Sequence, residues 1–214
     1  MGKDPLKETD FTPENASTDF NGTLYFFPNI RNMIDNLTAK DILLKYYSPD
    51  SELFHTLWIH SCQVAEKALE IAARFKGEVD EDFIYDAAIL HDIGIFKTNA
   101  PDIYCTGTEP YIRHGIIGAE LLRGLGLERH ALVCERHTGA GLSCEEIVAQ
   151  QLPLPHRDML PVSLEEKIIC YADKFFSKSH IQRIKTVDGI RKSMKKFGEA
   201  QLRRFDEMNE LFNR

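Results

Sequence analysis

The stretch AAILHDIGIFK, from Ala87 to Lys97, places a histidine and an aspartate side by side in an apolar run that breaks at a glycine. The apolar residues predict a buried helix, so His91 and Asp92 lie where a hydrophobic core is expected. Adjacent helical residues point about 100° apart, so the two side chains cannot share one packing contact, but both can reach a metal ion at the helix end. Burying both without partners costs several kcal/mol. The stretch therefore predicts a metal site, and Gly94 predicts that the backbone turns away after it.

Composition predicts one compact domain without nucleic-acid or membrane partners. The 214 residues are 43% hydrophobic, and 26 Lys and Arg against 33 Asp and Glu give a net charge of -7. No long basic run is present, which argues against nucleic-acid binding. No apolar run approaches the length of a membrane span, and the N-terminus lacks a signal-peptide core. An odd number of cysteines without a C-x-x-C pair indicates reduced core thiols and a cytoplasmic location: Cys62, Cys105, Cys134, Cys144 and Cys170.

Hydrophobic periodicity predicts an all-α protein. Residues 1–36 are expected to be an N-terminal extension that is largely irregular, although its apolar part from Leu24 to Ile34 could pack on the domain or form a subunit contact. Residues 37–182 form the predicted domain, and 183–214 an amphipathic helix packed on it, continuous from Val187 to Phe212. Apolar spacing and capping residues predict the other helices, over about 38–47, 50–76, 80–92, 111–123, 128–137, 143–151 and 163–173.

More polar residues interrupt these apolar helices, at or near positions that must be buried when the helices pack. They are His60, His114, His137 and Asp173. A single histidine on an apolar face is more often a hydrogen-bonded core residue than a metal ligand, and a buried aspartate needs a partner. Together with His91 and Asp92, however, these residues form one constellation drawn from helices that are distant in sequence.

The order of the constellation resembles the HD-domain superfamily, an all-helical group of metal-dependent phosphohydrolases. The motif is a histidine, a His-Asp pair followed by Ile-Gly, and a distant aspartate, matched by His60, His91, Asp92 and Asp173. The resemblance covers roughly Leu53 to Lys178, so it implies that 37–182 is an HD domain, a compact bundle with its metal site between helices. The stretches RHTGAGL (136–142) and LEEKIICYAD (164–173) also look like small HDIG proteins.

Two further histidines, His114 and His137, match the dinuclear six-ligand subset of that superfamily. The resemblance implies that His60, His91, Asp92 and Asp173 hold one metal, and that His114 and His137 hold a second, with Asp92 bridging both. Imidazole and carboxylate ligands without thiolate favour iron or manganese, with cobalt, nickel and zinc also suitable.

The resemblance implies hydrolysis of a phosphoester or phosphoanhydride in a small, nucleotide-like phosphorylated substrate. Two metals about 3.5 to 4 Å apart can generate a metal-bound hydroxide as nucleophile, so no serine or cysteine nucleophile is needed. Lys97, Arg113 and Arg136 lie near ligands in sequence and are candidate catalytic cations for the phosphoryl charge, alongside the bridging Asp92. Each of the three cations can equally be a solvated surface charge.

Two other functions use the same ligands. The alternative is an HD-type mixed-valent diiron oxygenase acting on a small organic substrate, and a third interpretation is a structural or regulatory nucleotide site. Cyclic-di-GMP hydrolysis is disfavoured, because Ile95 stands where that branch has a lysine directly after Ile-Gly. Specificity is expected to reside in the loops at 98–110 and 139–161, while the exact substrate and the oligomeric state, with a homodimer left open, do not follow from sequence.

Overall fold

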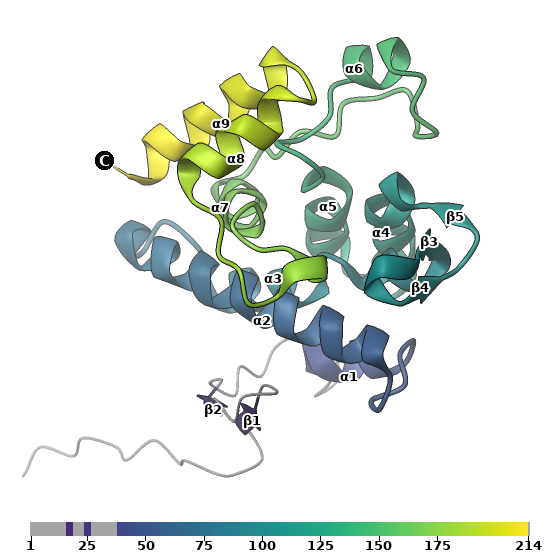
Figure 1. Ribbon diagram of the computed structural model, residues 1–214. Coiled ribbons are helices and arrows are strands. Elements are labelled where there is room, and N and C mark those ends of the chain that lie inside the picture. Colours follow the sequence, from purple (N-terminus) through teal and green to yellow (C-terminus); the bar gives the residue numbers. More distant parts are fainter. Residues whose placement is uncertain (1–15, 19–23, 27–37, 214) are drawn as a thin grey trace, which may run out of the picture.

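The protein is all-α, as predicted (Figure 1). A computed structural model describes residues 16–18, 24–26 and 38–213. Its α-helices are α1 (Ala39–Leu44), α2 (Glu52–Ala72), α3 (Glu81–Leu90), α4 (His114–Gly124), α5 (Glu128–Arg136), α6 (Cys144–Ala149), α7 (Leu164–Asp173), α8 (Val187–Lys195) and α9 (Glu199–Phe212). The predicted helices up to α7 are therefore confirmed to within a few residues at each end.

Short elements connect the helices. The 3₁₀ helices are η2 (Ala73–Phe75), η3 (Ile93–Lys97), η4 (Pro101–Ile103), η5 (Tyr111–Arg113) and η6 (Lys178–His180). Strand β3 (Thr98–Ala100) pairs antiparallel with β4 (Cys105–Thr106) and parallel with β5 (Glu109–Pro110). This small sheet lies beside α4 (Figure 1). It occupies the loop at 98–110 that was expected to carry specificity.

Part of the predicted N-terminal extension forms a strand pair. Strands β1 (Ala16–Thr18) and β2 (Leu24–Phe26) pair antiparallel, with Ser17 opposite Tyr25. The rest of the predicted 1–36 extension lies outside the described residues, including the part of its apolar segment that follows residue 26.

Polar caps set the starts of several helices. The Thr38 hydroxyl accepts from the backbone three residues on, and Ser143 does the same, each completing a predicted capping box. Ser163 also caps its helix, but the Glu166 carboxylate accepts from the Val162 amide at 2.9 Å instead of closing a box. The capping residues therefore predicted these three helix starts correctly.

The core lies where α2 packs against α3 and α7, and α4 against α5 and η3. Leu57, Val64 and Ala68 of α2 are fully buried, in line with the predicted apolar face. Gly77 follows the end of this helix with a φ of 86°, in the left-handed region that glycine adopts at little cost. His60 lies on the same buried face, so packing of α2 carries it into the interior.

The predicted continuous helix from Val187 to Phe212 is wrong, because it is two helices. Helix α8 ends at Lys195 and α9 begins at Glu199, after Gly198 with a φ of 118°. Apolar residues keep a helical spacing across the break, so the pattern could not reveal it. Helix α9 packs on α7, where Tyr171 stacks on Phe205 with ring centroids 5.4 Å apart. Figure 1 shows α8 and α9 side by side, on the opposite side of the bundle from the small sheet.

One buried carboxylate of α3 predicts a measurable pH dependence of stability. Asp86 is 7% exposed, its Oδ1 has no hydrogen-bond partner among the described residues, and burial, with repulsion by Asp82 and Asp80, raises its pKa to about 7. A raised pKa contributes stability that is present below the unfolded value near 4 and is lost as the pH rises through 7. Relative to wild type, we expect the free energy of unfolding of Asp86→Asn to rise by about 3 to 4 kcal/mol between pH 4 and pH 8, because one pKa unit corresponds to about 1.4 kcal/mol.

Urea unfolding at both pH values measures this difference. Glu81→Gln on the same helix is the control for loss of one exposed carboxylate. Parallel pH profiles of Asp86→Asn and wild type would contradict the prediction.

Candidate metal centre

Helix ends bring the predicted ligands together. His60 lies within α2, while the others lie at helix ends, where the chain can change direction: His91 at the end of α3, Asp92 just after it, His114 at the start of α4, His137 at the end of α5, and Asp173 at the end of α7. The six side chains meet in two groups that share Asp92, and the ligand atoms within each group lie within 4.8 Å of one another.

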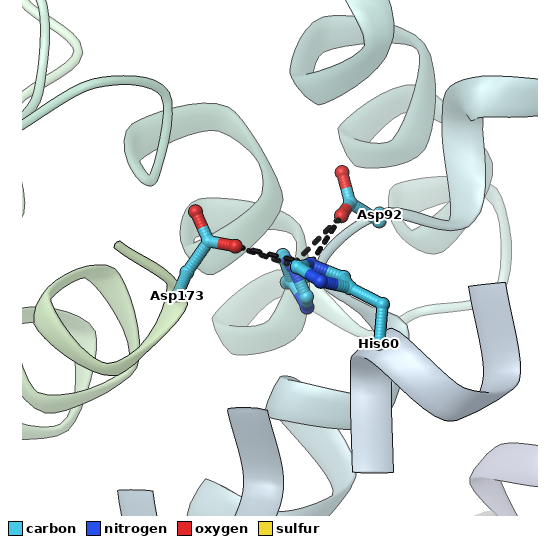
Figure 2. Close-up of side chains that lie close together, drawn as sticks. His60, Asp92 and Asp173 are labelled. Atoms are coloured by element: carbon cyan, nitrogen blue, oxygen red, sulfur yellow. Dashed lines mark ion pairs between the residues drawn. The ribbon is translucent and has the colours of Figure 1, made fainter. Parts of the chain in front are cut away.

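The first group surrounds one oxygen of Asp92. Figure 2 shows Asp92 and Asp173 on either side of the His60 ring. His60 Nε2 lies 3.3 Å from Asp92 Oδ2 and 3.0 Å from Asp173 Oδ1. His91 Nε2 lies 2.8 Å and 3.6 Å from the same two oxygens. Two imidazole nitrogens and two carboxylate oxygens therefore face one point.

The second group surrounds the other oxygen of the same carboxylate. Asp92 Oδ1 lies 3.4 Å from His114 Nε2 and 3.5 Å from His137 Nε2. Asp92 itself is 0% exposed. Each oxygen of Asp92 thus faces its own pair of histidines, which is the arrangement of a bridging ligand.

Backbone carbonyls orient three of the imidazoles. In each case Nδ1 lies within hydrogen-bond distance of the carbonyl three residues earlier: His91 to Ala88 at 2.6 Å, His114 to Tyr111 at 2.7 Å, and His137 to Cys134 at 2.8 Å. With the proton on Nδ1, the Nε2 lone pair points into the cluster. This is the usual way in which proteins prepare a histidine for metal binding.

The cluster has the unsatisfied acceptors that a cation would satisfy. The Nε2 atoms of His114 and His137 lie 3.0 Å apart, so in the Nδ1–H tautomer two lone pairs face each other. His60, His91 and Lys178 lie within ion-pair distance of Asp92. Even so, neither oxygen of Asp92 nor either ring nitrogen of His60 has a well-oriented hydrogen-bond partner among the described residues. Burying such acceptors unpaired is costly. Imidazole and carboxylate donors in this arrangement therefore fit divalent transition metals.

Electrostatics leave His114 and His137 neutral and the carboxylates ionised, whereas His91 without a metal carries an extra proton that a bound metal would displace. Burial lowers the pKa of His114 to about 3 and also lowers that of His137, so both rings are neutral. Burial alone would raise the pKa of Asp92, but the charges of His91 and Lys178 hold it well below its ordinary value. Burial opposes protonation of His91, while Asp92 and Asp173 raise its pKa to about 9. Burial also opposes ionisation of Asp173, but Lys174 and His60 hold its pKa well below its ordinary value. Both carboxylates are thus ionised at neutral pH.

Two lysines that the sequence interpretation missed adjoin the cluster. The Lys178 ammonium contacts Asp92 Oδ2, and Lys174 Nζ lies 2.7 Å from Asp173 Oδ2 and donates to the His137 carbonyl at 3.0 Å. Lys174 is 8% exposed. The sequence held a signal for it, because it directly follows a predicted ligand.

The three cations predicted from sequence lie elsewhere. Lys97 is exposed, with Nζ 5.8 Å from the centre of the Phe96 ring. Arg113 pairs with Glu109 at 3.0 Å, and Arg136 pairs with Glu166 at 3.0 Å. None of the three is among the residues that line the cavity at the cluster. Proximity in sequence to a ligand did not place these side chains at the site.

A cavity of about 720 Å³ opens beside the cluster. The loops at 98–110 and 139–161 both contribute to its wall, for example through Asp102, Ile103 and Leu142. Its wall includes three cluster residues and three lysines: His60, His114, Asp173, Lys174, Lys178 and Lys185. A space of this size admits a small molecule and holds it against the cluster.

The chain belongs to the HD-domain family, since the HD domain matches residues 57–177. This family comprises metal-dependent hydrolases, and all residues of the histidine and aspartate cluster lie within the matched region. Among the described helices, none is long and apolar enough to cross a membrane.

Curated relatives extend the comparison. An uncharacterized protein of Methanocaldococcus jannaschii is 37% identical over 160 residues, which are 72% of this chain and 86% of the relative. A tRNA (cytidine(56)-2'-O)-methyltransferase of Picrophilus torridus is 40% identical over 50% of this chain and 28% of its own length. The enzyme of that name from Thermoplasma volcanium is 28% identical over 84% of this chain and 49% of its own length. The chain thus spans half or less of these two methyltransferases, and no solved structure matches it.

Proposed function

We propose that this protein is a metal-dependent phosphohydrolase that cleaves a phosphoester or phosphoanhydride of a small, nucleotide-like molecule. One observation carries the proposal: a buried aspartate presents its two oxygens to two separate groups of histidines, beside a cavity whose wall includes lysine ammonium groups. Metal ligands and phosphate-binding cations therefore share one small space.

The two ligand groups suit two metals. His60, His91, Asp92 and Asp173 would hold one, and His114 and His137 the other, with Asp92 shared between them. Iron or manganese fits these donors best, with cobalt, nickel or zinc as substitutes. Two such ions would supply an activated water and Lewis-acid stabilisation of a phosphoryl group.

The residues of the chain supply orientation and charge. The Nδ1–carbonyl contacts keep three imidazole rings aimed into the cluster without movement during the reaction. Lys174 and Lys178 provide positive charge where the transferring phosphoryl group gains negative charge. The 720 Å³ cavity accommodates a mononucleotide-sized molecule, whereas a net charge of -7 does not favour binding of a polynucleotide.

Two ammonium groups at the cluster favour a substrate that carries phosphoryl or phosphonate oxygens. They argue against an oxygenase acting on a neutral substrate such as a polyol, and hydrolysis of a phosphorylated substrate uses them directly. The methyltransferase name of two relatives belongs to proteins of which this chain spans 28% and 49%. Methyl transfer is therefore not part of the proposal.

Parallel assays test the proposed function. Protein loaded anaerobically with Fe²⁺ or with Mn²⁺ is expected to release phosphate or a nucleotide product from a panel of nucleotides and sugar phosphates. Chelation with EDTA should abolish this turnover and metal should restore it, because the activated water depends on the metals. Colorimetric phosphate release and chromatography of the products are the measurements.

Oxygen consumption by the same iron-loaded protein is the discriminating control. Oxygen uptake with phosphonates or polyols, together with no phosphate release from the panel, would replace the hydrolase by the oxygenase. Metal binding without turnover in either assay would favour a structural or regulatory site.

A further inference from the structure

A third lysine, Lys185, lines the same cavity as Lys174 and Lys178. It lies outside the metal ligands and has no part in the chemistry described above. Clustering three ammonium groups in one cavity is unfavourable unless negative charge compensates them. The charges around them therefore indicate what the cavity binds.

A closed loop brings Lys185 back to the end of α7, where it lines the same cavity as Lys178. The chain leaves α7, passes through η6 and returns, so that the Lys185 amide donates to the Phe175 carbonyl at 2.8 Å and its ammonium donates to the Phe176 carbonyl at 3.0 Å. Gln63 of α2 donates to the Ile181 carbonyl at 2.9 Å and ties the loop to the bundle. Both ends of the loop and its middle are thus fixed.

The lysines are unequal in their counterions. Lys174 pairs with Asp173, and Lys178 pairs with Asp92. The Lys185 ammonium donates to a neutral carbonyl instead. Burial lowers its pKa, and the charges of Lys174 and Lys178 add to this against the opposing effect of Asp173. Lys185 therefore gains most from an added anion.

Carboxylates are scarce among the residues that line the cavity, which include only Asp102 and Asp173 among the described residues. When Asp92 and Asp173 bind metal, as the proposed function holds, their charge is shared with the ions. The three ammonium groups then need negative charge from the substrate. One phosphoryl group at the metals would meet Lys174 and Lys178, which contact the cluster carboxylates, and this leaves Lys185 for a second anionic group.

We propose that Lys185, with the hydroxyls of Ser177 and Ser179 and with Lys178 shared with the reacting phosphoryl group, forms an anion subsite beside the metal centre. This subsite selects substrates carrying two linked phosphoryl groups. These four residues all line the cavity. One phosphoryl group lies at the metals and its neighbour in the subsite, so the substrate class is a diphosphate ester or a longer phosphoanhydride. The inference rests on the proposed function and specifies its substrate.

Calorimetric titration tests the subsite without requiring turnover. Mn²⁺-loaded protein is titrated with methylenediphosphonate, whose P–C–P bridge resists hydrolysis, and separately with inorganic phosphate, at equal free Mn²⁺ in cell and syringe. Charge-assisted hydrogen bonds to a second phosphoryl group are expected to make the diphosphonate bind about tenfold more tightly or better.

Variants of Lys185 show whether the preference for the diphosphonate comes from this lysine or from direct binding of the diphosphonate to the metal. Lys185→Gln should bring the two affinities to within about twofold of each other, with phosphate binding unchanged, and Lys185→Arg should keep the preference because it keeps the charge. Lys192→Gln, which removes an exposed charge from α8 outside the cavity, should match wild type. If Lys185→Gln does not fold by circular dichroism, Ser179→Ala, which removes a hydroxyl of the subsite at an exposed position, should narrow the preference for the diphosphonate instead.

Equal affinities in wild type, or an unchanged preference in a folded Lys185→Gln protein, would overturn the subsite. Its failure is distinguishable from failure of the proposed function. A protein that hydrolyses phosphate monoesters without a diphosphonate preference keeps its function and lacks the subsite. If the diphosphonate preference depends on Lys185 but the protein hydrolyses no phosphate ester, the subsite is supported and the proposed function is contradicted.

Discussion

Replacing Asp92 by asparagine is expected to lower phosphate release by about 10³-fold or more, because it removes the ligand that both metals of the proposed mechanism would share. Asp92 Oδ2 faces His60 and His91, while Oδ1 faces His114 and His137. An amide keeps the shape of the side chain but loses its charge and one acceptor. Metal analysis should show a drop from about two equivalents per chain to one or fewer.

Two controls locate this effect. Asp86→Asn makes the same chemical change at another buried aspartate, on α3 but outside the cluster, and should keep full metal content and turnover. His114→Ala removes a ligand of one group alone and should leave about one equivalent of metal with the fold intact. Wild-type turnover in well-folded Asp92→Asn protein would refute the two-metal mechanism.

Replacing Gly94 by alanine is expected to destabilise the protein by about 3 kcal/mol or more, because there is no room for a methyl group. A Cβ at this position would lie 2.2 Å from the His114 carbonyl oxygen and 2.5 Å from the Gly118 nitrogen. Both contacts are with backbone, which cannot rotate away. Helix α4 would have to move from η3, and His114 would move from Asp92 with it.

Urea unfolding and metal titration measure the two consequences. Gly124→Ala, at the end of the same α4 helix, is the matched control, since a Cβ there meets nothing within 4 Å. It should be neutral or slightly stabilising, because alanine is the better helix former. A free energy of unfolding for Gly94→Ala within 0.5 kcal/mol of wild type would show that η3 and α4 are not in contact.

The role of Gly94 differs from the sequence prediction. Its presence after the His-Asp pair predicted a change of backbone direction, but its φ does not lie in the left-handed region. The glycine instead permits the close approach of η3 to α4, and so brings Asp92 to His114. Close approach between segments far apart in sequence leaves no local pattern.

The positions of the catalytic cations were likewise not predictable from local sequence patterns. Arg136 directly precedes His137, but adjacent residues at a helix end point in different directions, and Arg136 pairs with Glu166 while the histidine faces Asp92. Lys178 and Lys185 reach the cavity only because the loop after α7 folds back on itself. The break at Gly198 was hidden for a related reason, since the apolar spacing of α8 continues into α9.

The sequence by itself determined the all-α class, the helix starts marked by capping residues, and which six polar residues come together. Each of these follows from a local signal: periodicity, a cap, or a costly polar group in an apolar run. The family resemblance had already implied that Asp92 is shared by both histidine groups. Only the tertiary structure decided which oxygen of Asp92 faces which group and that Lys174 and Lys178, rather than Arg136, adjoin them. Those relations depend on how helix ends and loops meet in space, and no spacing along one segment encodes the direction of a side chain toward another.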